Sequence, residues 1–310
     1  MASTTHLASP EDDRRHRPGP GALPLWSESY WFPLYDPASE IGVVLRAGMY
    51  MKRGDANLYL FVTHKGAIVH AIAEHRAPAP PLDGDAFTVA GLRLDIEQPL
   101  ERFRLRYDAG PTAFDLRWNA TSPAYKYPTP PSDEFPGHIE QGGHVTGTVS
   151  LGGVSHPFDG VGHRDHSWGG ERDWAKFHRW TYLSGEFGAD FWFNAVRIDL
   201  GDQLDIRIGC LWDGQELHAL QQLEIEPRTV EGGSRQTGVD ARLTDEHGRE
   251  HRVTSEEVLV NCPVWMGRTA LKDAIVRYRY GERTGYGIHE HGYVETALRD
   301  SVSERGGERD

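Results

Sequence analysis

Fifteen consecutive residues, Gly160 to Trp174, concentrate the side chains of this chain that could do chemistry. They comprise two His, two Arg, two Asp, one Glu and two Trp among four Gly. Two tryptophans are out of place in a solvated loop, and a core strand cannot bury so many unpaired charges, at several kcal/mol each. Charged groups that hold one another beside a flat apolar surface are typical of a pocket wall, where perturbed titrating groups gather. We therefore expect the functional site here.

Within this run, Asp165 lies beside His166, with Arg164 and Arg172 nearby, and is a candidate proton donor. Adding water to an alkene, or closing a ring through a carbocation, needs a strong acid in a dry pocket. It also needs aromatic faces that shield the cation, each worth roughly 1 to 2 kcal/mol when desolvated. Burial would raise the pKa of the Asp165 carboxyl, whereas Arg164 and Arg172 would lower it. A Diels–Alder ring closure needs only a shaped apolar cavity and one hydrogen-bond donor, such as Arg164, His166 or Trp168.

The same charges have a structural alternative. Arg164 could pair with Asp173, or Asp165 with Arg172, in an ion-pair network that ties parts of the fold together. For the two tryptophans of the run, the corresponding alternative is plain core packing. The sequence leaves both alternatives open.

Composition bounds the class of protein. The 310 residues allow one large domain or two of ordinary size, and the formal charge of −13 argues against binding to nucleic acid or anionic membranes. No run of 18 apolar residues exists, so we expect no membrane span. Cys210 and Cys262 lie in apolar contexts and form no disulfide framework. With no signal-like apolar segment near the N-terminus, we expect a cytoplasmic protein.

The elements that must position the site are predicted to be β-strands. Many Gly, Pro, Trp and Tyr residues favour an all-β chain with frequent turns. Residues 102–107 and 114–118 alternate polar and apolar side chains, as strands with one wet face do. We expect two antiparallel β-barrels packed together, with few helices. The expected segments are a disordered polar arm (1–21), an N-terminal barrel (22–158), a C-terminal barrel (159–299) and a disordered tail (300–310).

Residues 162–169 (GHRDHSWG), followed by Arg172-Asp173-Trp174, resemble the signature of the double lipocalin-like proteins. That group includes carotenoid 1,2-hydratase, the AttH-like proteins, kievitone hydratase and several fungal Diels–Alderases. Residues 140–147 and 285–290 also resemble the group, and above all its bacterial branch. The resemblance implies two lipocalin-like barrels with a ligand cavity at or near their junction and no organic cofactor. It also implies hydration, dehydration or cyclisation of a hydrophobic substrate.

The resemblance also implies roles for individual residues. The His and Trp that are catalytic in the hydratase match His166 and Trp168. That enzyme also uses a Tyr and an Asp on the next strand, but the corresponding residues 191–195 (FWFNA) contain Asn194 and no carboxylate. Asn194 cannot protonate an alkene, which argues against carotenoid hydration. The expected catalytic residues are Asp165, His166, Trp168, Arg164 and Arg172, and the expected substrate contacts are Trp174, Trp180, Trp192, Asn194, Tyr50 and Glu140.

A metal site is the remaining chemical alternative. His289, His291 and Glu295 have the spacing of the first metal motif of cupins, but the second motif with its third His does not follow. We therefore predict no metal and no cofactor. The predicted function is an acid/base hydratase, dehydratase or cyclase acting on an isoprenoid- or polyketide-like substrate. A non-catalytic binder of a hydrophobic metabolite and a cupin-like metal enzyme stay as alternatives, and homodimer formation stays open.

Overall fold

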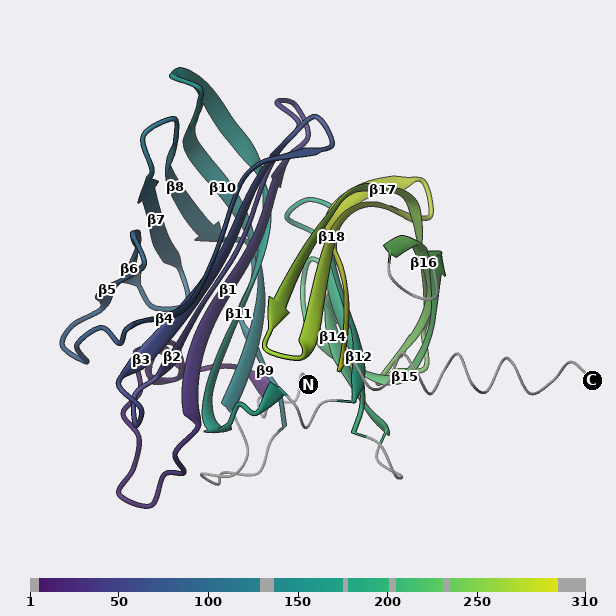
Figure 1. Ribbon diagram of the computed structural model, residues 1–310. Helices are drawn as coiled ribbons and strands as arrows, with labels where there is room; N and C mark the ends of the chain where they lie inside the picture. Colours follow the sequence, from purple (N-terminus) through teal and green to yellow (C-terminus); the bar gives the residue numbers. More distant parts are fainter. Residues whose placement is uncertain (1–5, 129–136, 175–177, 201–204, 231–234, 295–310) are drawn as a thin grey trace, which may run out of the picture. The chain divides into compact units, whose positions relative to one another are not determined.

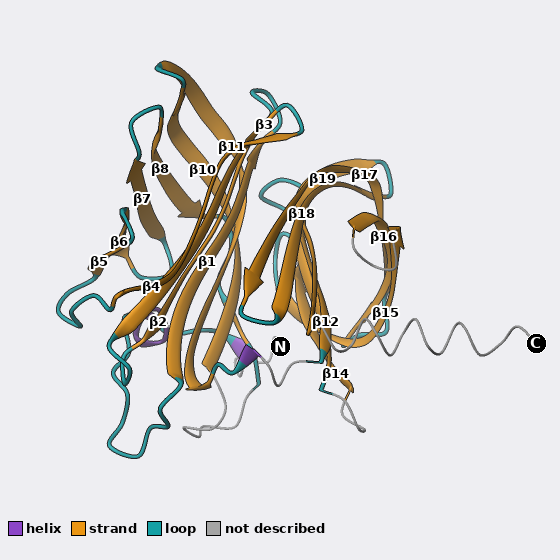
Figure 2. Ribbon diagram, in the orientation of Figure 1, coloured by secondary structure: helices purple, strands orange, loops and turns teal. Residues whose placement is uncertain are grey.

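The computed structural model describes residues 6–128, 137–174, 178–200, 205–230 and 235–294 (Figure 1). Within these ranges the elements are β-strands, apart from one short 3-10 turn, η2 (Pro10–Asp13) (Figure 2). The chain divides into two compact units, each described by itself. The first contains Met1–Arg172, Gly188–Phe191 and Trp212–Leu217, and the second contains the rest. The predicted all-β class is confirmed.

The first unit is built on one antiparallel sheet. Its strands are β1 (Trp26–Asp36), β2 (Ile41–Tyr50), β3 (Asp55–His64), β4 (Ala67–Pro78), β5 (Ala86–Val89), β6 (Leu92–Gln98), β7 (Arg102–Asp108), β8 (Thr112–Ala120), β9 (Tyr125–Lys126), β10 (Gly137–Leu151) and β11 (Val154–Glu171). They follow the order β4-β3-β2-β1-β11-β10-β8-β7-β6-β5, with β9 paired to β10. The predicted strands over 102–107 and 114–118 are β7 and β8. The sheet curls around an apolar core, so that Tyr30 of β1 contacts Phe87 of β5.

Strand β11 lies in the middle of this sheet, between β1 and β10 (Figure 1). It pairs with β10 over its whole length up to Trp168, and with β1 from Val161 onward. The chemistry-bearing run is therefore the second half of a long strand. The domain boundary expected after residue 158 falls inside this strand, and the first unit continues to Arg172.

The N-terminal arm packs onto the first unit. The backbone N of Ala8 donates to the carbonyl of Ala124, and Asp13 at the end of η2 is fully buried. The expectation of a disordered arm is therefore wrong for residues 6–21. Low hydrophobicity predicted disorder, but this arm is held by ion pairs and hydrogen bonds that composition does not reveal. The tail predicted over 300–310 lies outside the described residues.

The second unit is a closed antiparallel barrel. Its eight strands follow sequence order: β12 (Arg179–Glu186), β13 (Trp192–Asp199), β14 (Asp205–Trp212), β15 (Leu217–Val230), β16 (Arg235–Asp245), β17 (Glu250–Met266), β18 (Thr269–Tyr280) and β19 (Arg283–Val294). Closure pairs β19 with β12, which removes the open sheet edges. In the described part of the chain, no helix is long and apolar enough to cross a membrane.

Candidate active site

Strand alternation divides the predicted catalytic residues between the two faces of β11. His166 stacks on Tyr30 with ring centroids 4.0 Å apart, and Tyr30 belongs to the core of the first unit. Arg164 and Trp168, two residues before and after His166, share its face. Asp165 lies on the opposite face, directly across from Glu140 of β10. Asp165 and His166, both expected to be catalytic, therefore project from opposite faces of the strand.

On the core face, the arm and the sheet meet in an ion network. The guanidinium of Arg164 donates two parallel hydrogen bonds to the carboxylate of Asp13, at 2.7 and 2.9 Å. On the other side of His166, its Nε2 lies 3.1 Å from Oε1 of Glu28, while its Nδ1 lies 3.7 Å from Oδ1 of Asp13. All four residues are fully buried.

The charges of this network stabilise one another. Burial would raise the pKa of both Asp13 and Glu28, but their cationic and hydrogen-bonding neighbours lower both values below the ordinary range. Burial would lower the pKa of His166, but its contacts with Asp13 and Glu28 raise it. His166 thus lies between two carboxylates, which favour its protonated form. This arrangement is the structural network that the sequence left open, with Asp13 rather than Asp173 as the partner of Arg164.

On the opposite face of β11, a chain of hydrogen bonds runs from a hydroxyl to a carboxylate. Ser167 Oγ lies 2.7 Å from Nδ1 of His138, and Nε2 of His138 lies 2.6 Å from Oε1 of Glu140. The other oxygen of Glu140 lies 2.8 Å from Nε2 of His163. An ionised carboxylate only accepts hydrogen bonds, so both imidazoles donate to it. In neutral His138, Nδ1 then accepts the hydroxyl proton of Ser167.

The two carboxyl groups of this face titrate far apart. Burial raises the pKa of Asp165 to about 6, and the charge of Glu140 adds to that rise against the opposing effects of His138, Arg46 and Arg172. Burial would also raise the pKa of Glu140, but His138 and His163 lower it to about 2. Paired groups whose environments separate their pKa values are the usual arrangement of a general acid and its partner base.

Accessibility also distinguishes the two faces. Asp165 and His138 are partly exposed, whereas His166 and Arg164 on the core face have no exposed surface. Oδ1 of Asp165 is itself buried and has no hydrogen-bond partner among the described residues. A partly exposed side chain whose carboxyl has a pKa raised to about 6, with one oxygen free of hydrogen bonds, has the properties of a proton donor. We refer to Asp165, His138, Glu140 and Ser167 as the acid/base cluster.

The remaining predicted residues lie in different places. Arg172 follows β11, acts electrostatically on Asp165 and accepts a hydrogen bond from the Tyr50 hydroxyl on its carbonyl at 3.4 Å. Trp174, Trp180, Trp192 and Asn194 belong to the second unit. Trp174 and Trp180 have ring centroids 5.7 Å apart, Trp192 is fully buried, and Asn194 donates to the carbonyl of Leu183 at 3.3 Å.

Sequence reasoning missed Asp13, Glu28, His138 and Ser167. Asp13 was missed because the polar composition of the arm predicted disorder. Glu28 was missed because it lies in an aromatic segment without a clear period, so that no face could be assigned to it. His138 offered a usable signal, because it precedes Glu140 by two residues and a strand therefore places both on one face. Ser167 likewise shares the face of Asp165.

Three groups of described residues bring possible metal ligands together. They are His16, Glu28 and His166; His138, Glu140 and Asp165; and His218, Glu246 and His247, in each case with ligand atoms within 4.8 Å of one another. In the first group both histidines are hydrogen-bonded to Glu28, and in the second His138 is hydrogen-bonded to Glu140, while Asp165 approaches them without a hydrogen bond to either. The absence of a metal therefore stays a prediction.

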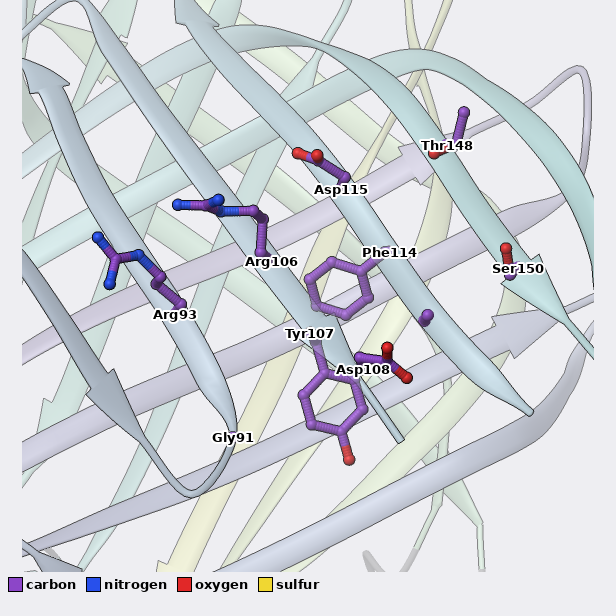
Figure 3. Close-up of a pocket in the computed structure, with 10 residues that line it drawn as sticks. Gly91, Arg93, Arg106, Tyr107, Asp108, Phe114, Asp115, Thr148 and Ser150 are labelled. Atoms are coloured by element: carbon purple, nitrogen blue, oxygen red, sulfur yellow. The ribbon is translucent and has the colours of Figure 1, made fainter. Parts of the chain in front are cut away.

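An open pocket of about 430 Å³ lies on strands β6, β7, β8 and β10 (Figure 3). It contains none of the predicted site residues. Its two arginines, Arg93 and Arg106, both pair with Asp95, at 2.8 and 2.6 Å. Because both of its arginines already form ion pairs, this pocket offers no free cationic anchor for a ligand.

Comparisons with known proteins agree with this architecture. A family model described as a domain of unknown function (DUF7064) matches residues 9–294. No curated protein sequence matches the chain. The solved structures that are similar in fold include the following three. An AttH from Nitrosomonas europaea has a TM-score of 0.64 and 16% identity, over 89% of this chain and 99% of that one.

Kievitone hydratase from Nectria haematococca has a TM-score of 0.62 and 14% identity, over 94% of this chain and 95% of its own. CghA has a TM-score of 0.61 and 10% identity, over 95% of this chain and 97% of its own. At such identities the likeness shows the fold alone. It confirms the predicted similarity to the double lipocalin-like group.

Proposed function

Because the chain belongs to the DUF7064 family and shares its fold with kievitone hydratase, we propose that it is an acid/base enzyme. Its reaction would be hydration, dehydration or cyclisation of a hydrophobic, isoprenoid- or polyketide-like small molecule. The observation that supports this most strongly is the facing pair of carboxyls on β10 and β11, with pKa values of about 6 for Asp165 and about 2 for Glu140.

In the hydration direction, Asp165 gives its proton to one carbon of the alkene, and a carbocation forms at the other carbon. Water attacks that carbon and loses a proton through the Ser167 hydroxyl to Nδ1 of His138. Glu140 stabilises the imidazolium that results, because it already accepts the Nε2 proton of His138. Transfer of a proton from His138 back to Asp165 restores the starting state. Dehydration is the same sequence in reverse.

Cyclisation would use the first of these steps. After Asp165 protonates the substrate, a second double bond attacks the cation in place of water, and the base removes a proton from carbon. Aromatic residues flank the acid, since Trp31 of β1 pairs with Asp165 and Tyr125 of β9 pairs with Glu140. Aromatic faces stabilise a desolvated cation by roughly 1 to 2 kcal/mol each.

His166, Trp168 and Arg164 have a positioning role in this proposal. The ion network holds β11 between β1 and the arm, so that Asp165 and Ser167 project from the opposite face at fixed positions. This assignment differs from the role that the resemblance implies for His166 and Trp168. Substitution separates the two assignments, because a positioning residue changes stability along with activity.

The test is turnover of a panel of isoprenoid and polyketide-like alkenes and tertiary alcohols in ¹⁸O-labelled water, followed by mass spectrometry. The wild type should incorporate the label or lose water, and Asp165→Asn should abolish this with the fold intact. Asp83→Asn, at an exposed position, is the matched control. Turnover by Asp165→Asn at the wild-type rate would overturn the assignment. Binding without any turnover by the wild type would instead support the non-catalytic binder.

A further inference from the structure

A group of possible metal ligands in the second unit takes no part in the proposed function. Strands β15, β16 and β17 are neighbours in its barrel, and the turn from β16 to β17 carries Glu246 and His247 (Figure 1). The backbone N of Glu246 donates to the carbonyl of Ala219 at 2.9 Å, which holds the turn beside His218 on β15. One nitrogen of each imidazole and one carboxylate oxygen lie within 4.8 Å of one another. We refer to His218, Glu246 and His247 as the turn cluster.

Asp245, the last residue of β16, fixes the shape of this turn. Its carboxylate is fully buried and accepts hydrogen bonds from the backbone N of His247 and of Arg249, both at 2.9 Å. The Nε of Arg249 donates to the same carboxylate at 2.6 Å. Gly248 completes the turn with a φ of +77°, in the left-handed region that glycine tolerates. The backbone that carries Glu246 and His247 is therefore in place before a ligand binds, which lowers the cost of binding.

The distances within the turn cluster fit ligands around one ion. Nδ1 of His218 lies 3.7 Å from Oε1 of Glu246, which is beyond the roughly 2.7 to 3.2 Å of a hydrogen bond. Around a tetrahedral zinc ion, with bonds of about 2.0 to 2.2 Å, neighbouring ligand atoms are about 3.4 Å apart. The rings of His218 and His247 have centroids 5.2 Å apart, and two imidazoles on one such ion would have centroids roughly 5 Å apart.

The two groups of possible ligands in the first unit differ in this respect. Their imidazoles lie 2.6 to 3.1 Å from a carboxylate oxygen, so hydrogen bonds hold them together without an ion. In the turn cluster, Nδ1 of His218 and the Glu246 carboxylate are farther apart than a hydrogen bond allows. An ion between them would bond to both atoms after a movement of a few tenths of an ångström.

The types and the exposure of the three ligands indicate which ion would bind. Two imidazoles and one carboxylate suit Zn²⁺, whereas Mg²⁺ and Ca²⁺ take oxygen ligands. His218 is buried, Glu246 is partly exposed and His247 is exposed, so the cluster can be reached from solvent. A metal-ligating histidine gives its other ring nitrogen to a second partner. The site therefore uses Nδ1 of His218 and leaves Nε2 to the other contacts of that ring.

We propose that the turn cluster binds one Zn²⁺ ion, with Nδ1 of His218, a carboxylate oxygen of Glu246 and a ring nitrogen of His247 as ligands. The ion ties the β16–β17 turn to β15 and leaves its fourth tetrahedral position to water. The site lies within the second unit and does not depend on the acid/base cluster. It departs from the prediction that the chain holds no metal, which rested on the incomplete cupin motif at His289 and His291.

The probe for testing this site is Zn²⁺ alone, added to the full chain without an affinity tag after treatment with EDTA. Isothermal titration should show zinc binding, and zinc should raise the melting temperature, because it binds the folded state. His247→Ala should lower the zinc affinity at least tenfold, since the loss of even an outer-shell partner costs about 10- to 100-fold. It should also abolish the rise in melting temperature. No zinc binding by the wild type, or equal affinity in His247→Ala, would overturn the proposal.

Further variants locate the ion. Glu246→Gln keeps the size of the side chain and should also lower zinc affinity at least tenfold, and it decides the matter if His247→Ala does not fold, as circular dichroism would show. His75→Ala removes another exposed histidine, on β4, and should leave zinc affinity unchanged. Asp165→Asn should bind zinc like the wild type. A tenfold loss in Asp165→Asn, with full binding by His247→Ala, would place the ion in the acid/base cluster and contradict the proposal.

Discussion

Glu140 and Asp165 face each other on β10 and β11, and the pKa values of their carboxyls move in opposite directions. The difference arises from hydrogen bonds. Glu140 accepts from two imidazoles, whereas Oδ1 of Asp165 has no partner among the described residues. One strand pair therefore holds two carboxyls side by side, of which Glu140 is ionised and Asp165 keeps its proton up to about pH 6.

The first prediction is the pH dependence of turnover. Asp165 must be protonated to act, so activity should fall about tenfold per pH unit well above pH 6. Glu140→Gln removes a negative charge that raises the pKa of Asp165, and the midpoint of the fall should move to lower pH. A pH–rate profile of both proteins measures this. A midpoint that stays in place would exclude Asp165 as the titrating acid.

The second prediction concerns the buried pair of Arg164 and Asp13. Arg164→Met should cost about 3 to 5 kcal/mol of unfolding free energy, because it leaves the buried carboxylate of Asp13 without its guanidinium partner. Urea denaturation measures the loss. Arg242→Met removes an exposed arginine with surface ion pairs and should cost less than about 1 kcal/mol. Similar losses in the two variants would contradict the burial of the Arg164 pair.

The third prediction is the contribution of His166 to stability at different pH values. Folding raises the pKa of His166. The stability that its charge contributes is therefore fully present below about pH 6.5, which is the pKa of the unfolded side chain. That stabilisation is lost as the pH rises through the folded pKa. His166→Gln should thus lose more stability at pH 6 than at pH 9, as thermal melts in matched buffers would show. Equal losses at both values would argue that His166 is neutral.

The fourth prediction concerns the N-terminal arm. Deleting residues 1–17 removes Asp13 and the backbone and ring contacts of His16 with Glu28, and should lower the melting temperature. Combined with Arg164→Met, the deletion should cost less than the sum of the two changes, because both remove the same ion pair. A chain lacking only residues 1–5, which keeps Asp13 and His16, is the comparison for the length of the deletion. Additive losses would contradict direct coupling.

The fifth prediction tests the packing of tryptophans over glycines in the sheet. A methyl group on Gly143 would overlap the indole of Trp118, whose Nε1 donates to the carbonyl of Gly162 at 2.9 Å. Gly143→Ala should therefore destabilise the protein by about 1 to 3 kcal/mol. Gly21→Ala adds the same methyl group in open space and should be close to neutral. Chemical denaturation of both variants measures the two losses of unfolding free energy, and equal losses would contradict the close packing of Trp118 on Gly143.

Much of the fold could be predicted from the sequence. The alternation of polar and apolar side chains over β7 and β8 indicated the all-β class, and the motif around His166 indicated the similarity to double-barrel proteins. The composition of the site was predicted better than its geometry. Asp165 and His166 are neighbours in the chain, and we expected their run to form one wall of a pocket. Because the run is a β-strand, adjacent side chains point to opposite faces, and the two residues lie apart. Asp13 was out of reach, because its partner Arg164 lies 151 residues away and no local pattern records such a pairing.

The position of β1 has a consequence for the order of assembly. This strand lies between β2, which follows it at once, and β11, which is made more than a hundred residues later. During synthesis, the β1–β2 hairpin exists before β11 is made. Until then the outer edge of β1 is unpaired and Glu28 lacks its contact with His166. The first unit can close only when β11 leaves the ribosome. An interruption of translation before that point would expose an aggregation-prone edge, so this half of the protein is expected to depend on chaperones.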